Sequence, residues 1–139
     1  MRVIKRILLL FFISAAAACQ NAVQPIVTDG RYDVVVLQQG PTSVGVNRDT
    51  LRLAAKYFDS VIRHAGGLPA LYSVWPTADR LVDFDRATES YMLVAQDVDV
   101  MHLPAGETWR AAWRRDPSLA FYSADGLHTR RLSGPTPLH

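Results

Sequence analysis

Asp125 and His128 stand three residues apart near the end of the chain, in the sequence DGLH. At this spacing a carboxylate can turn back to Nδ1 of the imidazole within one turn. That contact fixes the tautomer and leaves Nε2 free to take a proton from a nucleophile. An Asp that caps a turn beside an exposed His gives the same spacing by chance. The pair is therefore a candidate base and orienting carboxylate that needs support from other motifs.

A hydrolytic site also needs a nucleophile, and three serines come into question. Ser43 follows a predicted strand, but its surroundings (QGPTS) lack the strand–turn–helix pattern of a nucleophile elbow. Ser73 is predicted to pack within a strand (LYSVWP), and Ser123 is predicted to be a turn residue. None of the three is a strong candidate from its surroundings.

The remaining histidines and the tryptophans have structural interpretations. His64 is predicted on the polar side of a helix near its end, and His102 in a strand as a core imidazole. No metal-ligand spacing and no phosphate-binding glycine loop occurs, so we expect neither a metal nor another cofactor. Trp75, Trp109 and Trp113 are predicted to line a core or a groove. Without a basic cluster beside them, no nucleic-acid partner is expected.

Alternating strands and helices would position these residues. The predicted strands are residues 33–38, 68–75 and 100–103, and the predicted helices are residues 49–65, 84–98 and 104–115. Strand–helix alternation three times over favours a parallel sheet with right-handed crossovers, and hence the α/β class. In such sheets ligands bind beyond the carboxyl ends of the strands.

Residues 32–128 resemble the SGNH (GDSL-like) hydrolases, which are serine esterases and acylhydrolases on a flavodoxin-like sheet. The stretches DVVVLQQGPTS, LYSVWP, LPAGETWRAAWRRDP and DGLH carry the resemblance. It implies a three-layer α/β/α fold and a small-molecule ester substrate. The closing block of the family is D-x-x-H, so the resemblance implies that His128 is the general base and Asp125 its orienting partner.

The third family block, G-x-N-D, is matched only in part. Gly40 stands at the position of its glycine, whereas Thr42 replaces the asparagine that donates to the oxyanion hole in the family. Gln38 or Gln39 could take over that donation. Gly40, Gln39 and Thr42 are therefore the candidate oxyanion or substrate loop.

The family's nucleophile block, G-[DN]-S after the first strand, has no counterpart. Between Cys19 and Tyr32 there is neither an apolar strand nor a serine, and the two first strands of the family would need to precede Tyr32. Without them the edge of the strand at 34–37 would be exposed. We therefore expect a truncated hydrolase domain (residues 32–128) with impaired or no activity. The alternative is a non-catalytic protein that uses the substrate cleft of the hydrolase fold for binding.

The last residues of the chain suggest a frameshift in the gene. Residues 129–139 form an irregular tail without periodicity, where the family usually continues into a long helix. A frameshift just after His128 and an internal deletion before Tyr32 would explain both departures.

The N-terminus is typical of an exported protein. The chain has 139 residues with 15 basic and 13 acidic side chains, and three of the basic ones, Arg2, Lys5 and Arg6, precede any acidic residue. They are followed by an uncharged run at residues 7–18, shorter than the about 20 apolar residues of a membrane span. Positive, apolar and small residues in this order predict a signal peptide over residues 1–18.

Cys19, the single cysteine of the chain, follows Ala16-Ala17-Ala18, which resembles the lipobox of bacterial lipoproteins. The resemblance implies that Cys19 is lipidated and anchors the protein to a membrane in the cell envelope. Residues 19–31 would then be a tether. A cleaved secretory signal with an incidental cysteine remains the alternative.

Overall fold

The computed structural model describes residues 6–12, 17–40, 45–124 and 126. The elements along the chain are β1 (Ile7–Phe12), α1 (Ala17–Gly30), β2 (Val34–Gln39), α2 (Gly45–His64), β3 (Leu68–Tyr72), the 3₁₀ helix η1 (Ala78–Asp83), α3 (Phe84–Val98), β4 (Met101–Leu103) and α4 (Ala105–Arg115). The helices and strands predicted after residue 32 are all present, with ends shifted by a few residues.

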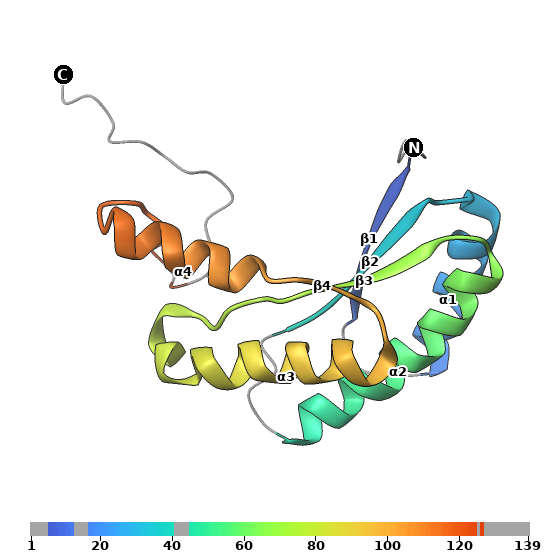
Figure 1. The fold of residues 1–139 in the computed structure, drawn as a ribbon, viewed down its shortest axis with the longest axis horizontal. Helices are drawn as coiled ribbons and strands as arrows, with labels where there is room; N and C mark the ends of the chain where they lie inside the picture. Colours follow the sequence, from blue (N-terminus) through green and yellow to red (C-terminus); the bar gives the residue numbers. More distant parts are fainter. Residues whose placement is uncertain (1–5, 13–16, 41–44, 125, 127–139) are drawn as a thin grey trace.

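The four strands form one parallel sheet in the order β1-β2-β3-β4 (Figure 1). Each strand lies beside the next one along the chain. Right-handed crossovers between such neighbours put α1, α2 and α3 on the same face of the sheet. The predicted α/β class with a parallel sheet is confirmed.

The main hydrophobic core lies between the sheet and these three helices. It contains Val27 from α1, Val35 and Leu37 from β2, Leu51, Ala55, Phe58 and Ile62 from α2, Leu71 from β3, and Tyr91, Val94 and Ala95 from α3. The apolar residues of α2 recur at helical spacing, so one face of the helix is buried while the other carries charges.

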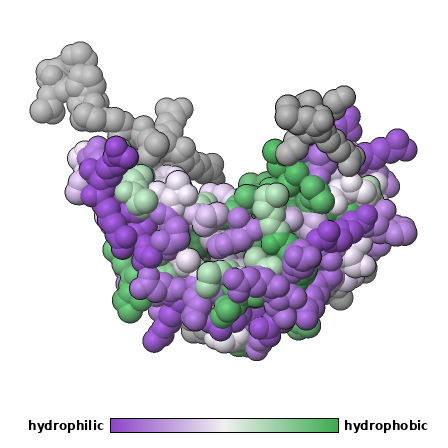
Figure 2. Space-filling view, in the orientation of Figure 1, coloured by the Kyte–Doolittle hydropathy of each residue, from purple (hydrophilic) through white to green (hydrophobic). Residues whose placement is uncertain are grey.

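The opposite side of the sheet, which we call the open face, carries apolar side chains from all four strands. Val34, Val36 and Ala70 form a small buried cluster there. Around them Ile7, Leu9, Leu68 and Met101 are 64%, 47%, 52% and 51% exposed. Figure 2 shows hydrophobic residues in a hollow over the sheet. Parallel sheets usually have both faces covered, but among the described residues only one face carries a helical layer.

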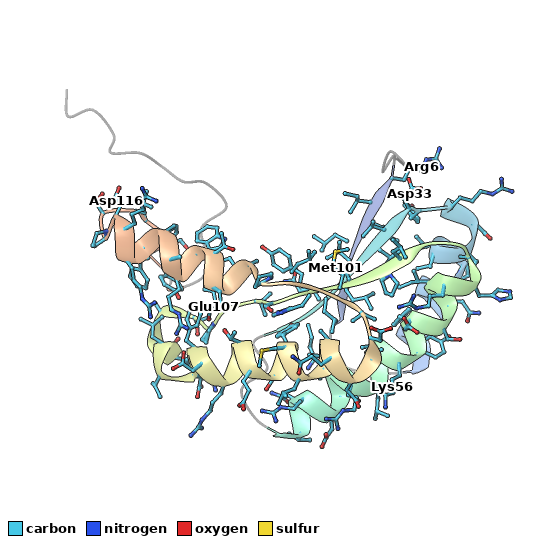
Figure 3. The ribbon with its side chains drawn as sticks, viewed as in Figure 1. Arg6, Asp33, Lys56, Met101, Glu107 and Asp116 are labelled. Carbon is cyan, nitrogen blue, oxygen red and sulfur yellow. The ribbon has the colours of Figure 1, made fainter. Side chains whose placement is uncertain are left out.

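β1 corrects one expectation from the sequence. A strand ahead of Tyr32 was not expected, and yet β1 pairs with β2 from Ile7↔Val34 to Phe12↔Gln39. At its start, the Arg6 carbonyl accepts from the Asp33 and Val34 amides, and the Arg6 amide donates to Asp33 Oδ2 at 3.0 Å (Figure 3). The edge of β2 is therefore covered. An uncharged apolar run suits a buried strand as well as a signal peptide, which is why the sequence did not reveal it.

The structure also differs from the tether expected over residues 19–31, because α1 occupies nearly all of them. Val27 of this helix is 1% exposed in the core. Gln24 accepts a hydrogen bond from the Tyr57 hydroxyl of α2 at 2.9 Å. Arg31 then adopts a left-handed backbone conformation (φ 49°) and ends the helix. The polar residues 20, 21 and 24 and Pro25 are typical of an irregular segment, but contacts with α2 hold it as a helix.

Neighbouring leucines of β1 allow its place in the sheet to be tested. Leu8 packs against the main core, whereas Leu9 lies on the open face. In the full-length chain, Leu8→Ala should lower the free energy of unfolding by about 1 to 2 kcal/mol, because partly buried methyl groups lose their contacts. Leu9→Ala should cost at most about 0.5 kcal/mol. Urea denaturation measures both, and equal losses would contradict the register.

Candidate functional site

The carboxyl ends of β2, β3 and β4 meet at one edge of the sheet, where α/β folds bind ligands. Of the site residues expected from the sequence, Gln39 and Gly40 lie at this edge. Thr42, Asp125 and His128 lie outside the described residues, as does Ser43. Two described segments therefore bear on the candidate site. They are the end of β2 and the residues that lead into the DGLH block.

A tyrosine from α3 holds the end of β2. The fully buried Tyr91 hydroxyl accepts from the Gln39 amide at 3.0 Å, donates to the Gln39 carbonyl, and lies 3.3 Å from the Gly40 carbonyl. Gln39 Nε2 in turn donates to the Asn47 carbonyl at 3.3 Å. Among the described residues, no atom other than those of its chain neighbours lies within 4 Å of a Cβ added at Gly40.

The sequence predicts the helix over residues 84–98 and does not single out Tyr91. A buried tyrosine hydroxyl requires a hydrogen-bond partner, so a tyrosine at a core position of this helix indicates a polar contact inside the fold. The partner could not be named, because it lies 52 residues away along the chain.

Gly126, the described residue of the DGLH block, lies against the loop that follows β3. Its carbonyl accepts from the Ala78 amide at 3.1 Å, and its amide donates to the Ser123 carbonyl at 2.9 Å. Gly126 has a φ of 76°, which favours glycine at this turn. Just before it, the Tyr122 hydroxyl donates to the Pro76 carbonyl at 3.0 Å. Ser123 is thus a turn residue, as predicted.

Stacked aromatic rings join the same segment to α4. Trp75, which follows β3, stacks on Trp109 with ring centroids 4.6 Å apart. Phe121 packs edge-on against Trp109 and Trp113 at 4.5 and 6.0 Å, and Tyr122 packs against Trp113 at 5.8 Å. The predicted structural role of the tryptophans is confirmed, and their rings position the approach to the DGLH block.

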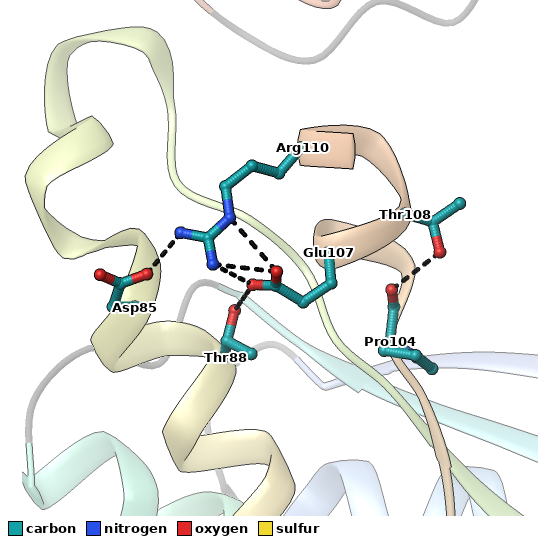
Figure 4. Close-up of polar contacts among 6 residues, drawn as sticks. All are labelled: Asp85, Thr88, Pro104, Glu107, Thr108 and Arg110. Atoms are coloured by element: carbon teal, nitrogen blue, oxygen red, sulfur yellow. Dashed lines mark hydrogen bonds and ion pairs between the residues drawn. The ribbon is translucent and has the colours of Figure 1, made fainter. Parts of the chain in front are cut away.

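A network of charged groups fixes α4 to the start of α3 (Figure 4). Arg110 bonds to Asp85 and to Glu107, and Glu107 accepts from the Thr88 hydroxyl at 2.8 Å. The guanidinium also lies 4.6 Å from the centre of the Phe84 ring. The hydrogen bond with Asp85 is the main reason that the pKa of Arg110 is raised. Helix α4 is therefore held by polar contacts as well as by the aromatic rings.

Ser73 and His102 form the one serine–histidine side-chain contact recorded among the described residues. Ser73 Oγ lies within hydrogen-bonding distance of His102 Nε2, and burial lowers the pKa of His102. Ser73 is only 1% exposed, so no substrate carbonyl reaches its hydroxyl in this conformation. The contact joins β3 to β4 as a structural pair, in line with the sequence. His64 ends α2 and is exposed, also as predicted.

The described ranges contain neither a metal-binding cluster nor a membrane-spanning helix. In that part of the chain no group of three or more His, Cys, Asp or Glu residues is arranged to hold a metal ion. No helix there is both long and apolar enough to cross a bilayer. Cys19 lies in the first turn of α1.

Comparison with known proteins gives a likeness of fold. No protein-family model and no curated protein matches the sequence. A solved structure of a candidate SGNH hydrolase from Slackia heliotrinireducens matches 78% of the chain with a TM-score of 0.64 at 20% sequence identity. The match spans 63% of that protein, so over a third of its length has no counterpart here. At this identity the likeness supports the fold and leaves the chemistry to be argued from residues.

The partly buried imidazole of His102 predicts a pH dependence of stability. The folded pKa of His102 lies below the value of about 6.5 in an unfolded chain. Between the folded and the unfolded pKa the unfolded state binds more protons. The free energy of unfolding should therefore be highest above about pH 6.5 and should fall as the pH drops below it. His102→Gln should reduce this slope. Urea denaturation between pH 7.5 and 5 measures it, and parallel curves for the two proteins would contradict the prediction.

Proposed function

We propose that the protein is an SGNH-type ester hydrolase in which the nucleophile block is missing and activity is impaired or absent. His128 is the general base, and Asp125 orients its imidazole. Gln39 and Gly40 lie on the side where the carbonyl oxygen of an ester would be held. No metal or other cofactor takes part in this chemistry.

The position of Gly126 is the observation that carries the proposal. Its carbonyl accepts a hydrogen bond from the Ala78 amide, so Gly126 lies beside the start of η1. Gln39 and Gly40 lie at the end of β2 in the parallel sheet. An acyl-transfer site needs a base and oxyanion donors around one carbonyl group, and these two segments are where they would come from.

The missing nucleophile sets the expected rate. With no serine in a G-[DN]-S motif, His128 can only take a proton from water, whose oxygen then adds to the ester carbonyl. Collapse of the tetrahedral intermediate expels the alcohol, which takes up the proton, and leaves the acid. Loss of a catalytic nucleophile lowers rates by several orders of magnitude. Slow hydrolysis of activated esters is therefore the expected limit.

The alternative is a non-catalytic protein that binds ligands in the same cleft. The burial of Ser73 favours it, since the serine that contacts a histidine in the described part of the chain is inaccessible. The two hypotheses share the edge of the sheet and differ in whether turnover occurs.

Hydrolysis of p-nitrophenyl acetate and butyrate by the purified full-length protein distinguishes them. If His128 acts as a base, His128→Ala should lower the protein-dependent rate by about 100-fold or more. The matched control is His64→Ala, which removes an exposed imidazole at the end of α2 and should leave the rate unchanged. Equal rates for the wild type and His128→Ala would exclude the enzymatic hypothesis.

We further propose that the protein is exported and anchored to a membrane through lipidated Cys19. The positive segment, the apolar run and the single cysteine after small residues support this. Cleavage before Cys19 would remove β1 and with it the strand that covers the edge of β2. A molecule that is cleaved before Cys19 therefore lacks β1, and a molecule that keeps β1 has not been cleaved there.

Mass spectrometry of the protein from a bacterial host with lipoprotein processing tests the anchor. We expect a chain that starts at Cys19 and carries acyl groups, and that enters the detergent phase on phase separation. Cys19→Ala should abolish both the acylation and the partitioning. An unmodified chain that still begins at Met1 would contradict export and would favour a retained β1.

A further inference from the structure

The end of β2 continues beyond the strand that pairs with it. The ladder between β2 and β3 has its last register pair at Leu37↔Leu71. The Asp33 carbonyl is on the β3 side, where it accepts from the Leu68 amide at 2.9 Å. Because alternate residues of a strand bond to opposite neighbours, the amide and carbonyl of Gln39 face the same side. Among the described residues, however, no register pair between β2 and β3 follows Leu37↔Leu71.

The Tyr91 hydroxyl takes the place of that missing pair. It accepts the Gln39 N–H at 3.0 Å and donates to the Gln39 carbonyl, so one side-chain oxygen satisfies both backbone groups. Tyr91 is fully buried, and its ring packs in the main core. The position of Gln39 is thus set by α3 through a rigid side chain.

Ser90, the residue before Tyr91, contacts the start of α2, the helix that follows β2 along the chain. The buried Ser90 hydroxyl accepts from Arg48 Nε at 3.0 Å, and Glu89 accepts from Arg48 Nη2 at 3.4 Å. Arg48 lies in the first turns of α2, directly after the loop. One turn of α3 therefore fixes the chain on both sides of the connection between β2 and α2.

We propose that Tyr91 is a positioning residue of the candidate site, which holds Gln39 and Gly40 where an acyl group binds. This inference rests on the proposed function and adds a role that acts through the backbone. No other described part of the chain lies within 4 Å of a Cβ added at Gly40, so none of the described elements covers the segment that Tyr91 holds. Backbone groups that are held in place before a ligand arrives lose little entropy on binding, so loss of the Tyr91 hydroxyl should weaken ligand binding at Gln39 and Gly40 more than it destabilises the fold.

Tyr91→Phe is the test variant, because it keeps the ring in the core and removes only the hydroxyl. Its matched control is Tyr57→Phe, which removes a hydroxyl that donates to Gln24 in α1. Amide hydrogen exchange should become about fivefold faster or more at Gln39 in Tyr91→Phe, as expected for loss of one hydrogen bond. Exchange at Val35 and Leu37, and throughout β2 in Tyr57→Phe, should be unchanged.

Functional readouts separate positioning from stability. If the wild type hydrolyses p-nitrophenyl butyrate, Tyr91→Phe should lower kcat about tenfold or more with little change in KM, at a temperature where both proteins are folded. If the wild type does not hydrolyse it, butyrate itself is the probe. Its addition should then shift the amide resonances of Gln39 and Gly40 in the wild type and in Tyr57→Phe, and much less in Tyr91→Phe.

The outcomes distinguish this inference from the proposed function. Equal hydrolysis by the wild type and His128→Ala, with butyrate still shifting Gln39 and Gly40, would overturn the enzyme and support positioning in a binding protein. Unchanged exchange at Gln39 in Tyr91→Phe would overturn the inference. Faster exchange with unchanged kinetics or butyrate shifts would also overturn it and leave Tyr91 a purely structural residue. A wild type that neither hydrolyses the ester nor responds to butyrate would exclude both.

Discussion

The hydrogen-bond ladder of β2 is the constraint on which the rest of the structure depends. β1 pairs with one side of this strand and β3 with the other, and the Tyr91 hydroxyl completes the pairing at its carboxyl end. Its side chains alternate between the main core and the open face. Since a buried backbone group without a partner is costly, each neighbour of β2 is needed. The candidate site stands at the end of this fully paired strand.

The pairing of β1 conflicts with the predicted fate of the N-terminus. An uncharged run such as residues 7–12 is apolar enough for a signal peptide and long enough for a strand. A signal peptide is removed, whereas β1 covers the edge of β2 and contributes Leu8 to the core. An exposed strand edge promotes pairing with other chains. Whichever fate prevails, the edge of β2 must be covered, so processing and folding are physically linked in this protein.

Periodicity predicted those parts of the fold whose burial pattern is local. The helical spacing of Leu51, Phe58 and Ile62 and the uninterrupted run of β2 identified α2 and a buried strand. Helix α1 escaped prediction because its helical form depends on contacts with α2, which local composition does not encode. In the site, residue types singled out Gln39 and Gly40. The hydroxyl that fixes them is 52 residues away, and only the fold brings it there.

The two halves of the candidate site are held by different parts of the molecule. Tyr91 fixes Gln39 and Gly40 from within the main core, where α3 packs on the sheet. The segment that leads into the DGLH block is held by aromatic rings on α4, which is itself tied to the start of α3 through Arg110. Both attachments lead to α3, which carries Tyr91 as well as Asp85. A shift of α4 would therefore move Phe121 and Tyr122 without disturbing the contacts that Tyr91 makes with Gln39 and Gly40.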